Sequence, residues 1–260
     1  MLKLSQRLQT IADLVPPGAR TADIGSDHAL LPVYLVQSGK SPSAIAGEVN
    51  AGPLKAASAQ IAASGLAGSI HARLGDGLSV LEPGEADCVT IAGMGGALMA
   101  DILAKGAAAG KLEGVRTLVL QPNVGEDIVR GWLIKHGWYL AAERLLEEDG
   151  KFYEVLLALR IPDAELLQRS VYDPHFLQVE HSEETKCGWL LRMGPWLLRQ
   201  PPEAFYRKWS DEQEKLRTVC AQIDRSQSAE AQEKSRAIRS DIDRIGEVLA
   251  CLHTVRPSLN

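Results

Sequence analysis

The stretch Arg20-Thr-Ala-Asp-Ile-Gly-Ser-Asp-His-Ala29 decides the fold. Its first five residues form a short run that is typical of a buried strand, and Gly25 then permits a tight turn and a close approach of the backbone to a ligand. The turn matches neither G-x-G-x-x-G nor G-x-x-x-x-G-K-[ST], so it lacks the glycines of a phosphate-binding loop. Asp23 and Asp27 would repel a pyrophosphate, and they favour a cationic or zwitterionic ligand.

Four further strand-like runs follow, at residues 43–47, 69–74, 87–92 and 116–120, with helical stretches such as 53–64 and 97–109 between them. Repeated strand–helix units predict a parallel sheet with helices on both faces. The last two runs, 138–147 and 151–160, are separated by Glu148-Asp-Gly150, and Asp-Gly between apolar runs is a strong hairpin signal. We therefore expect an α/β fold with a seven-stranded, mostly parallel sheet that ends in an antiparallel hairpin.

Acidic residues stand at the ends of the second and third strands as well. Glu48 lies about 20 residues beyond the first turn, where a carboxylate can accept both hydroxyls of a ribose. Asp76 lies between Gly75 and Gly77, where it can accept a hydrogen bond from the amino group of adenine, although an aspartate at such a place is often only a helix N-cap. Three acids without a phosphate cradle fit an adenosine that carries a positive centre, as in S-adenosylmethionine. With the terminal hairpin, they predict a class I (Rossmann-like) methyltransferase fold.

Seven motifs extend the pattern in the same order along residues 2–160. They are Lys3-Leu-Ser-x-Arg-Leu8, Ala22-Asp-Ile-Gly-Ser-Asp-His-Ala29, Ala46-Gly-Glu48, Gly75-Asp-Gly77, Ile91-Ala-Gly-Met-Gly-Gly96, Leu120-Gln-Pro-Asn123 and Leu146-Glu-Glu-Asp-Gly150. Together they resemble the bacterial TrmK-type tRNA (adenine(22)-N1)-methyltransferases. The resemblance implies methyl transfer from S-adenosyl-L-methionine to N1 of adenine 22 in tRNA. It also implies that Asp27, Glu48 and Asp76 contact the cofactor and that Gly93 and Met94 lie near the methyl group.

The expected cofactor-binding residues all follow strand ends. They are Asp23, Gly25, Ser26, Asp27, His28, Glu48, Val49, Asp76, Gly77, Ala92, Gly93 and Met94. Adenine N1 has a lone pair at neutral pH, so placement against the methyl group can supply much of the acceleration without a strong base. The product ring is cationic, and nearby acceptors would stabilise it. We expect Asp27 to be this catalytic group, helped by the backbone carbonyls of 92–94.

Substrate contacts are expected from two further places. Gln121-Pro122-Asn123 presents two amides at the fifth strand end, with Gln121 held extended by the proline, unless Asn123 serves only as an N-cap. His28 is either a substrate contact or a helix-start residue. Long basic side chains more often lie on plain solvated faces, but eight of them are candidates for tRNA contact: Lys3 and Arg7 near the N-terminus, and Arg192, Arg199, Arg207, Lys208, Arg236 and Arg239. The absence of an Asp/Asn-Pro-Pro-Tyr signature argues against methylation of an exocyclic amino group.

The chain divides after residue 162, which predicts a methyltransferase domain at 1–162 and a helical domain at 163–260. Residues 163–185 are acidic and lack a sustained period, whereas 186–260 carry 13 basic against 10 acidic residues. Two apolar seams at helical spacing follow, each expected on one helix. The first consists of Trp209, Leu216 and Ile223, and the second of Ile238, Ile242, Ile245, Leu249 and Leu252. Two such helices joined by the polar stretch 226–233 are expected to pack as an antiparallel coiled-coil hairpin that contacts tRNA, rather than as a dimerisation zipper.

Composition excludes several classes of protein. The 260 residues carry a formal charge of -5, which excludes a uniformly basic nucleic-acid wrapper. The four cysteines form no C-x-x-C pair, so neither a disulfide framework nor a structural zinc site is expected. The N-terminus does not resemble a signal peptide and no apolar run reaches the roughly 20 residues of a membrane span. We expect a cytoplasmic monomer without a metal or a membrane partner.

Two alternatives to the tRNA methyltransferase remain open at this stage. One is a methyltransferase that acts on another RNA, a small molecule or a protein, because the fold does not specify the substrate. The other is a non-catalytic RNA-binding scaffold that retains the cofactor fold. An NAD-dependent dehydrogenase is disfavoured by the missing phosphate-binding glycines.

Overall fold

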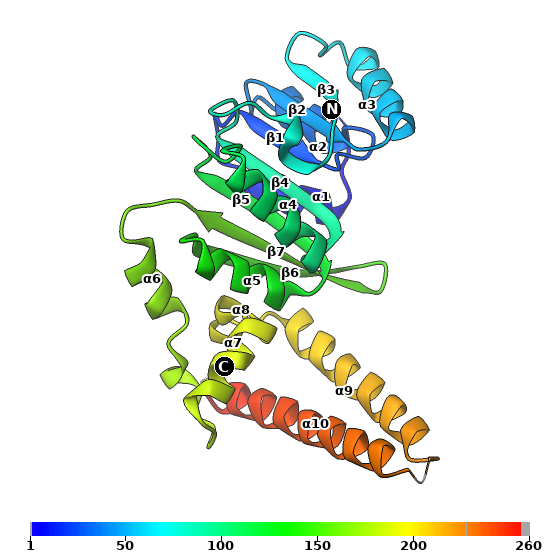
Figure 1. Ribbon diagram of the computed structural model, residues 1–260, viewed down its shortest axis with the longest axis vertical. Coiled ribbons are helices and arrows are strands. Elements are labelled where there is room, and N and C mark those ends of the chain that lie inside the picture. Colours follow the sequence, from blue (N-terminus) through cyan, green and yellow to red (C-terminus); the bar gives the residue numbers. More distant parts are fainter. Residues whose placement is uncertain (1, 227, 256–260) are drawn as a thin grey trace, which may run out of the picture. The chain divides into compact units, whose positions relative to one another are not determined.

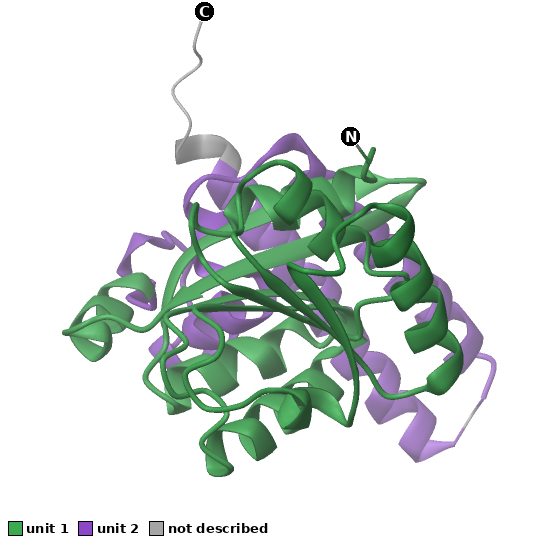
Figure 2. Ribbon diagram, turned by 90° about the horizontal axis from the view of Figure 1, so that it is seen from above, with its two compact units in different colours: residues 1–171 green, residues 172–260 purple. Residues whose placement is uncertain are grey.

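The computed structural model describes residues 2–226 and 228–255, and it divides into two compact units, residues 1–171 and 172–260 (Figure 1, Figure 2). Helix α6 (Ala164–Val171) belongs to the first unit, because Gln168 Oε1 accepts a hydrogen bond of 2.9 Å from the backbone N–H of Leu140. The division therefore comes after residue 171, not after residue 162 as the change in composition suggested. A composition shift marks where a sheet ends, but it does not reveal that the next helix packs back onto that sheet.

The first unit is built on one seven-stranded sheet in the order β3-β2-β1-β4-β5-β7-β6 (Figure 1). Strands β1 to β5 are parallel, and β7 is antiparallel to both β5 and β6. The strands are β1 (Thr21–Ile24), β2 (Ala44–Glu48), β3 (Ile70–Leu74), β4 (Cys88–Gly95), β5 (Thr117–Val124), β6 (Tyr139–Glu148) and β7 (Lys151–Leu159). This confirms the predicted mostly parallel sheet with its antiparallel hairpin.

The hairpin of β6 and β7 turns at the predicted Asp-Gly pair. Asp149 has φ 51° and Gly150 has φ 69°, and Glu148 pairs directly with Lys151. A two-residue turn with both central residues at positive φ matches the right-handed twist of the strands that it joins. The local sequence thus sets the register of the pair that closes the sheet.

The strand order reverses between β1 and β4, and this places the helices on two faces. Right-handed crossovers put the helices of β1–β2–β3 on one face and those of β4–β5–β6 on the other (Figure 1). Residues of α1 and α2 share one buried cluster, and residues of α2 and α3 share another. The helices are α1 (Gln6–Leu14), α2 (Leu30–Gln37), α3 (Ala51–Ala63), the 3₁₀ turn η1 (Gly77–Val80), α4 (Gly96–Ala108) and α5 (Glu126–Lys135). Ligands of such sheets bind at the carboxyl ends of the strands beside this reversal.

The second unit is helical in the residues that the structure describes. Its elements are η2 (Pro174–Phe176), α7 (Glu183–Met193), α8 (Pro195–Arg199), α9 (Glu203–Ile223) and α10 (Ala229–Val255). Helices α9 and α10 run antiparallel, since Cys220 Sγ lies 3.0 Å from Ser235 Oγ and Gln213 Nε2 donates to the carbonyl of Ile242 at 2.8 Å. The predicted helical hairpin is therefore present, with a turn that is shorter than the polar stretch because α10 already begins at 229.

The sequence left Val219 and Cys220 as alternatives within the first seam, and in the second seam the structure buries Val248 while the predicted Leu249 is only partly buried. Cys220 is buried on α9 while Val219 beside it is exposed, so Cys220 continues the stripe begun by Trp209. On α10, Ile245, Val248 and Leu252 are buried. None of the helices in the described ranges is long and apolar enough to cross a membrane.

Candidate active site

The loop after β1 is brought against the carboxyl end of β4 at the reversal of strand order. Gly25 has φ +71°, and its N–H donates to the carbonyl of Gly47 at 2.9 Å. A Cβ at this position would lie 2.3 Å from Met94 Cε, which is far inside van der Waals contact. The left-handed backbone therefore favours glycine here, and a side chain at this position would force the end of the Met94 side chain to move.

The same loop continues through three residues of left-handed backbone that are not glycine. Asp27, His28 and Ala29 have φ of 32°, 62° and 55°, a conformation that costs L-residues free energy and is found preferentially at functional sites. Glu48 supports this geometry, because its buried Oε1 accepts a hydrogen bond of 2.6 Å from the N–H of Asp27. The Asp27 side chain is 84% exposed, with Oδ1 3.5 Å from His28 Nε2. The loop thus presents an aspartate and a histidine at the strand ends.

Asp23 and Ser26 support this loop from inside the protein. Both are buried, and the Asp23 carboxylate accepts hydrogen bonds from Thr90 Oγ1 at 2.6 Å and from Ser26 Oγ at 2.7 Å. Burial raises the pKa of Asp23 above its ordinary value, while the two hydroxyls act in the opposite direction. Both side chains therefore face the β1–β4 junction, whereas we had expected them among the residues that contact the cofactor.

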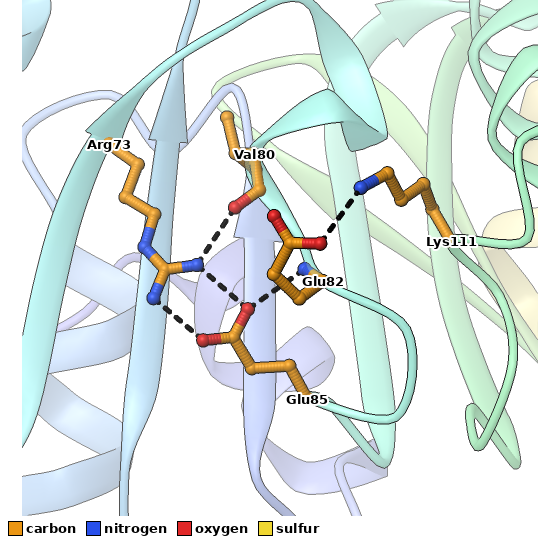
Figure 3. Close-up of polar contacts among 5 residues, drawn as sticks. All are labelled: Arg73, Val80, Glu82, Glu85 and Lys111. Atoms are coloured by element: carbon orange, nitrogen blue, oxygen red, sulfur yellow. Dashed lines mark hydrogen bonds and ion pairs between the residues drawn. The ribbon is translucent and has the colours of Figure 1, made fainter.

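The third acid, Asp76, lies at the exposed end of β3. It occupies the N-cap position of η1, yet its carboxylate makes no capping hydrogen bond, so the N-cap interpretation does not apply. The loop behind it is fixed by Arg73, whose guanidinium donates to both oxygens of Glu85 at 2.7 and 2.6 Å and to the carbonyl of Val80 (Figure 3). A cavity of about 330 Å³ opens beside Asp76 between η1 and α4.

Figure 3 also shows a second ion pair on this loop, between Lys111 Nζ and Glu82 at 3.3 Å. Arg73 and Glu85 are both about one-third exposed, and hydrogen bonding from the guanidinium lowers the pKa of the Glu85 carboxyl. The pair holds the two ends of the segment 73–85 together. The position of Asp76 is thus set by a bidentate clamp below it.

At the ends of β4 and β5, one amide side chain joins three segments of chain. Gln121 is fully buried, and its Oε1 accepts hydrogen bonds from Arg7 Nη1 at 2.7 Å and from the N–H of Gly93 at 3.1 Å. Its Nε2 donates to Asn123 Oδ1 at 3.1 Å, and Asn123 Nδ2 donates to the carbonyl of Gly93 at 2.8 Å. Asn123 is exposed and is not a helix cap, because the N-cap of α5 is Gly125.

Arg7 lies on α1 and faces the strand ends. Its guanidinium carbon is 5.5 Å from the ring centroid of Tyr153, in addition to the bond to Gln121. The first turn of α1 is held by Glu148, which accepts from the N–H groups of Gln6 at 2.6 Å and Arg7 at 3.2 Å. Arg7 therefore helps to hold the ends of β4 and β5 in place. Of the two N-terminal cations expected to contact tRNA, Lys3 is exposed and Arg7 is partly buried.

The TrmK family model, described as tRNA (adenine(22)-N(1))-methyltransferase, matches residues 21–247. The chain belongs to this family. A curated TrmK relative, the tRNA (adenine(22)-N(1))-methyltransferase of Bacillus subtilis (strain 168), is 43% identical over 244 residues, which cover 94% of each protein. The resemblance inferred from the seven motifs is thereby confirmed.

Solved structures agree with the sequence comparison. The crystal structure of the B. subtilis m1A22 tRNA methyltransferase TrmK matches with a TM-score of 0.81 at 40% identity, covering 95% of this chain and 99% of that one. A Streptococcus pneumoniae protein in complex with S-adenosyl-L-methionine matches with a TM-score of 0.78 at 38% identity, covering 95% of this chain and 100% of that one. The predicted class I methyltransferase architecture with a helical C-terminal part is confirmed.

Relative to the TrmK motifs, the structure separates the predicted site residues into two sets. Those at the carboxyl edge of the sheet are Gly25, Asp27, His28, Glu48, Val49, Asp76, Gly77, Ala92, Gly93, Met94 and Asn123, of which Glu48 is itself buried. Those turned inward are Asp23, Ser26, Gln121 and Pro122. The support by Arg7, Thr90 and Arg73 was not predicted. Arg7 carried a signal, since it belongs to a quoted motif, but the partner of a long side chain cannot be read from sequence.

The carboxyl edge fits an adenosine-type cofactor on its own chemistry. Oxygen acceptors come from Glu48, whose Oε1 is engaged by the loop while Oε2 makes no hydrogen bond within the described residues, and from the uncapped Asp76. Neither the 25–29 loop nor the 75–77 loop contains a lysine or arginine that would bind a phosphate. Within the described residues, no cluster of His, Cys, Asp and Glu has the arrangement of a metal site.

The cations of the helical unit that we expected to contact tRNA fall into two sets: those that bind other groups of this unit and those that are exposed. Arg192 Nη1 binds Asp241 Oδ1 at 2.6 Å, Arg239 Nη2 binds Asp224 Oδ2 at 2.5 Å, and Arg199 Nη1 donates to the carbonyl of Pro195 at 3.0 Å. Lys208 Nζ lies 5.5 Å from the ring centroid of Trp209, and Arg207 is on the same helix. Arg236 is exposed on α10. Several of these side chains thus contribute to the packing of the helices.

Proposed function

We propose that the chain transfers the methyl group of S-adenosyl-L-methionine to N1 of adenine 22 in tRNA. The observation that carries the proposal is the acidic carboxyl edge of a class I methyltransferase sheet, in which Glu48 and Asp76 offer acceptors at successive strand ends. Membership of the TrmK family supports the choice of tRNA and of the N1 position, since the B. subtilis relative bears that activity in its name.

In this proposal each half of the edge has its own ligand. Glu48 Oε2 accepts from the ribose hydroxyls and Asp76 from the adenine amino group, with Gly77 and the exposed Val49 beside them. Gly25 lets the loop approach Met94 closely at the reversal of strand order, and Asp23 and Ser26 hold the loop from below. When bound, S-adenosyl-L-methionine supplies an electrophilic methyl group.

Asp27, His28 and Asn123 are the side chains that we assign to the target adenine. Adenine N1 carries a lone pair at neutral pH, so these residues need to orient the ring and stabilise the positive charge that develops on it. The exposed Asp27 carboxylate can accept a hydrogen bond from the amino group and offset that charge. Gln121 and Pro122 act indirectly, because they fix Asn123 and Gly93.

The helical unit supplies tRNA contacts, including one from the exposed Arg236 on α10, and Lys3 adds a contact from the first unit. Extruding a stacked base requires contacts elsewhere on the tRNA, and phosphate contacts by basic side chains provide them. A tRNA substrate implies a cytoplasmic enzyme, and we propose that it acts as a monomer.

The test is nucleoside mass spectrometry of tRNA incubated with the protein and S-adenosyl-L-methionine, followed by mapping of the modified position. We expect 1-methyladenosine at position 22 and none when that adenine is replaced by guanine. Asp27→Asn should bind the cofactor as the parent does and turn over at least about tenfold more slowly, because it loses a charge-assisted hydrogen bond. Methylation of another base or atom would overturn the substrate assignment, and an unchanged turnover of Asp27→Asn would remove its catalytic role.

A further inference from the structure

Two exposed aliphatic side chains stand beside the proposed base site. Val124 is the last residue of β5 and is 67% exposed, and Ile128 in the first turn of α5 is 45% exposed. Val124 directly follows Asn123, whose Nδ2 donates to the carbonyl of Gly93 at 2.8 Å. Single exposed aliphatics are common on protein surfaces, but an adjacent pair that continues the edge of a site indicates contact with a ligand.

The backbone beneath this pair is rigid. Val124 pairs with Gly95 across the β4–β5 ladder, and a Cβ on Gly96 would come within 2.0 Å of the Gly125 carbonyl oxygen. Gly125 itself has φ +76°, and the Ile128 Cδ1 lies 3.3 Å from the position that a Cβ on Gly125 would take. Glycines thus allow the two strand-to-helix junctions to pack backbone against backbone, and the aliphatic pair projects from a fixed base.

Charge limits which part of a nucleic acid can pack on this pair. Glu126 and Asp127 lie between Val124 and Ile128 in the chain, so a phosphodiester backbone would be repelled there. An aliphatic surface that rejects phosphate can still pack on the face of a nucleobase. Exposed aliphatics on the other half of the edge, Val49 and Leu74, follow β2 and β3 on the cofactor side instead.

We infer that Val124 and Ile128 form an aliphatic wedge that packs on the base stacked next to the target adenine and occupies the space that the adenine leaves when it is extruded. The inference rests on the proposed function and adds to it the residues that maintain the extruded state. An enzyme that reaches N1 of a stacked adenine has to compensate for lost stacking, and inserted aliphatic side chains do so in other proteins that unstack bases.

The test uses the full-length protein and three variants, Val124→Ala, Ile128→Ala and the double variant. Each single substitution removes apolar contact with the base and should lower kcat/KM for tRNA about tenfold. The double variant should lower kcat/KM for tRNA by up to about a hundredfold. Affinity for S-adenosyl-L-methionine alone should not change. Matched controls are Ile134→Ala at the other end of α5, where Ile134 is 40% exposed, and Leu166→Ala on α6, where Leu166 is as exposed as Val124 at 67%. Both controls should keep the parent rate.

Two further measurements link the effect to extrusion of the base. A tRNA with 2-aminopurine next to the target adenine should fluoresce more strongly when the parent protein binds, and this increase should shrink in the double variant at saturating protein. A tRNA in which the neighbouring nucleotide is abasic has no stacking to lose, so it should restore most of the variant's rate relative to the parent. A double variant that matches the controls, or a loss that the abasic tRNA does not reduce, would overturn the wedge. Failure of the parent protein to methylate position 22 would instead overturn the proposed function.

Discussion

Replacing Gly25 with alanine tests the contact that joins the two halves of the site. Gly25 has φ +71°, and an added Cβ would lie 2.3 Å from Met94 Cε. Gly39 offers a matched control, because it has φ +72° and nothing within 4 Å of an added Cβ. The two substitutions therefore share the backbone cost of a left-handed alanine and differ only in their surroundings.

The magnitudes follow from these two environments. A left-handed L-residue costs about 1–2 kcal/mol, which the smaller entropy of the unfolded alanine chain offsets by about 0.4–1 kcal/mol. Gly39→Ala should thus lose about 1 kcal/mol of unfolding free energy. In Gly25→Ala, Met94 Cε must also retreat by about 1.2–1.7 Å to reach an ordinary carbon contact. Because Met94 Cε is the free end of a flexible side chain, this shift costs little stability, but it displaces Met94 at the place assigned to the methyl group.

Chemical denaturation would measure the unfolding free energies, and calorimetry with S-adenosyl-L-methionine the affinities. We expect Gly25→Ala to weaken cofactor binding about tenfold or more and Gly39→Ala to leave it unchanged. Adding Met94→Ala to Gly25→Ala removes the clashing atom, so the pair should show a favourable coupling in a double-mutant cycle. Equal affinities for Gly25→Ala and Gly39→Ala, or additive effects of Gly25→Ala and Met94→Ala, would refute the assigned contact.

Asp76→Asn should weaken cofactor binding about tenfold to a hundredfold in calorimetry, because a charged acceptor is lost, whereas Asp101→Asn, whose carboxylate holds Lys105 at 2.7 Å, should not. Hydrogen bonding from Arg20 lowers the pKa of Asp87 to about 2, so this pair stabilises the fold above pH about 4 and the stabilisation fades as the pH falls toward 2. Asp87→Asn should cost about 1 kcal/mol near pH 7 and flatten that decline in pH-dependent melts, since the pair is partly exposed. Arg236→Glu should weaken tRNA binding and reduce its salt dependence by about one ion, whereas Lys55→Glu on α3 should do neither. Equal effects of Asp76→Asn and Asp101→Asn would contradict the cofactor contact of Asp76, and equal effects of Arg236→Glu and Lys55→Glu would contradict the tRNA contact of Arg236.

The fold was predictable because its decisive signals are local. Strand ends are marked by glycines and acids, and the Asp149-Gly150 turn sets the last pair of strands in register without help from distant residues. The domain boundary was not predictable in the same way. Helix α6 is amphipathic, and it packs on the first unit through the buried Ala164 and Val171 and through Gln168, which bonds the backbone of β6 across 28 residues.

The candidate site was predictable in position but not in orientation. Every acid and amide that was named does lie in or just after the carboxyl end of a strand, yet Asp23 and Gln121 point inward and serve other parts of the protein. Successive side chains along a strand point to opposite faces of the sheet, and a one-residue bulge changes the face to which a side chain points. The irregular β4–β5 register near Met94 is an example of such a change. Long-range partners such as Arg7 and Gln121, 114 residues apart, follow only from tertiary packing.

The reversal of strand order separates two chemistries on one edge. The ends of β1, β2 and β3 carry carboxylates, whereas the ends of β4 and β5 carry backbone groups, one exposed amide and the aliphatic pair. The halves meet where Met94 lies against Gly25 and where Thr90 bonds Asp23, and both contacts lie between β1 and β4. Substitutions farther along β5 should therefore alter the handling of the target base with little effect on cofactor affinity. Substitutions at these two contacts should alter both, because each contact joins the β1 side of the edge to β4.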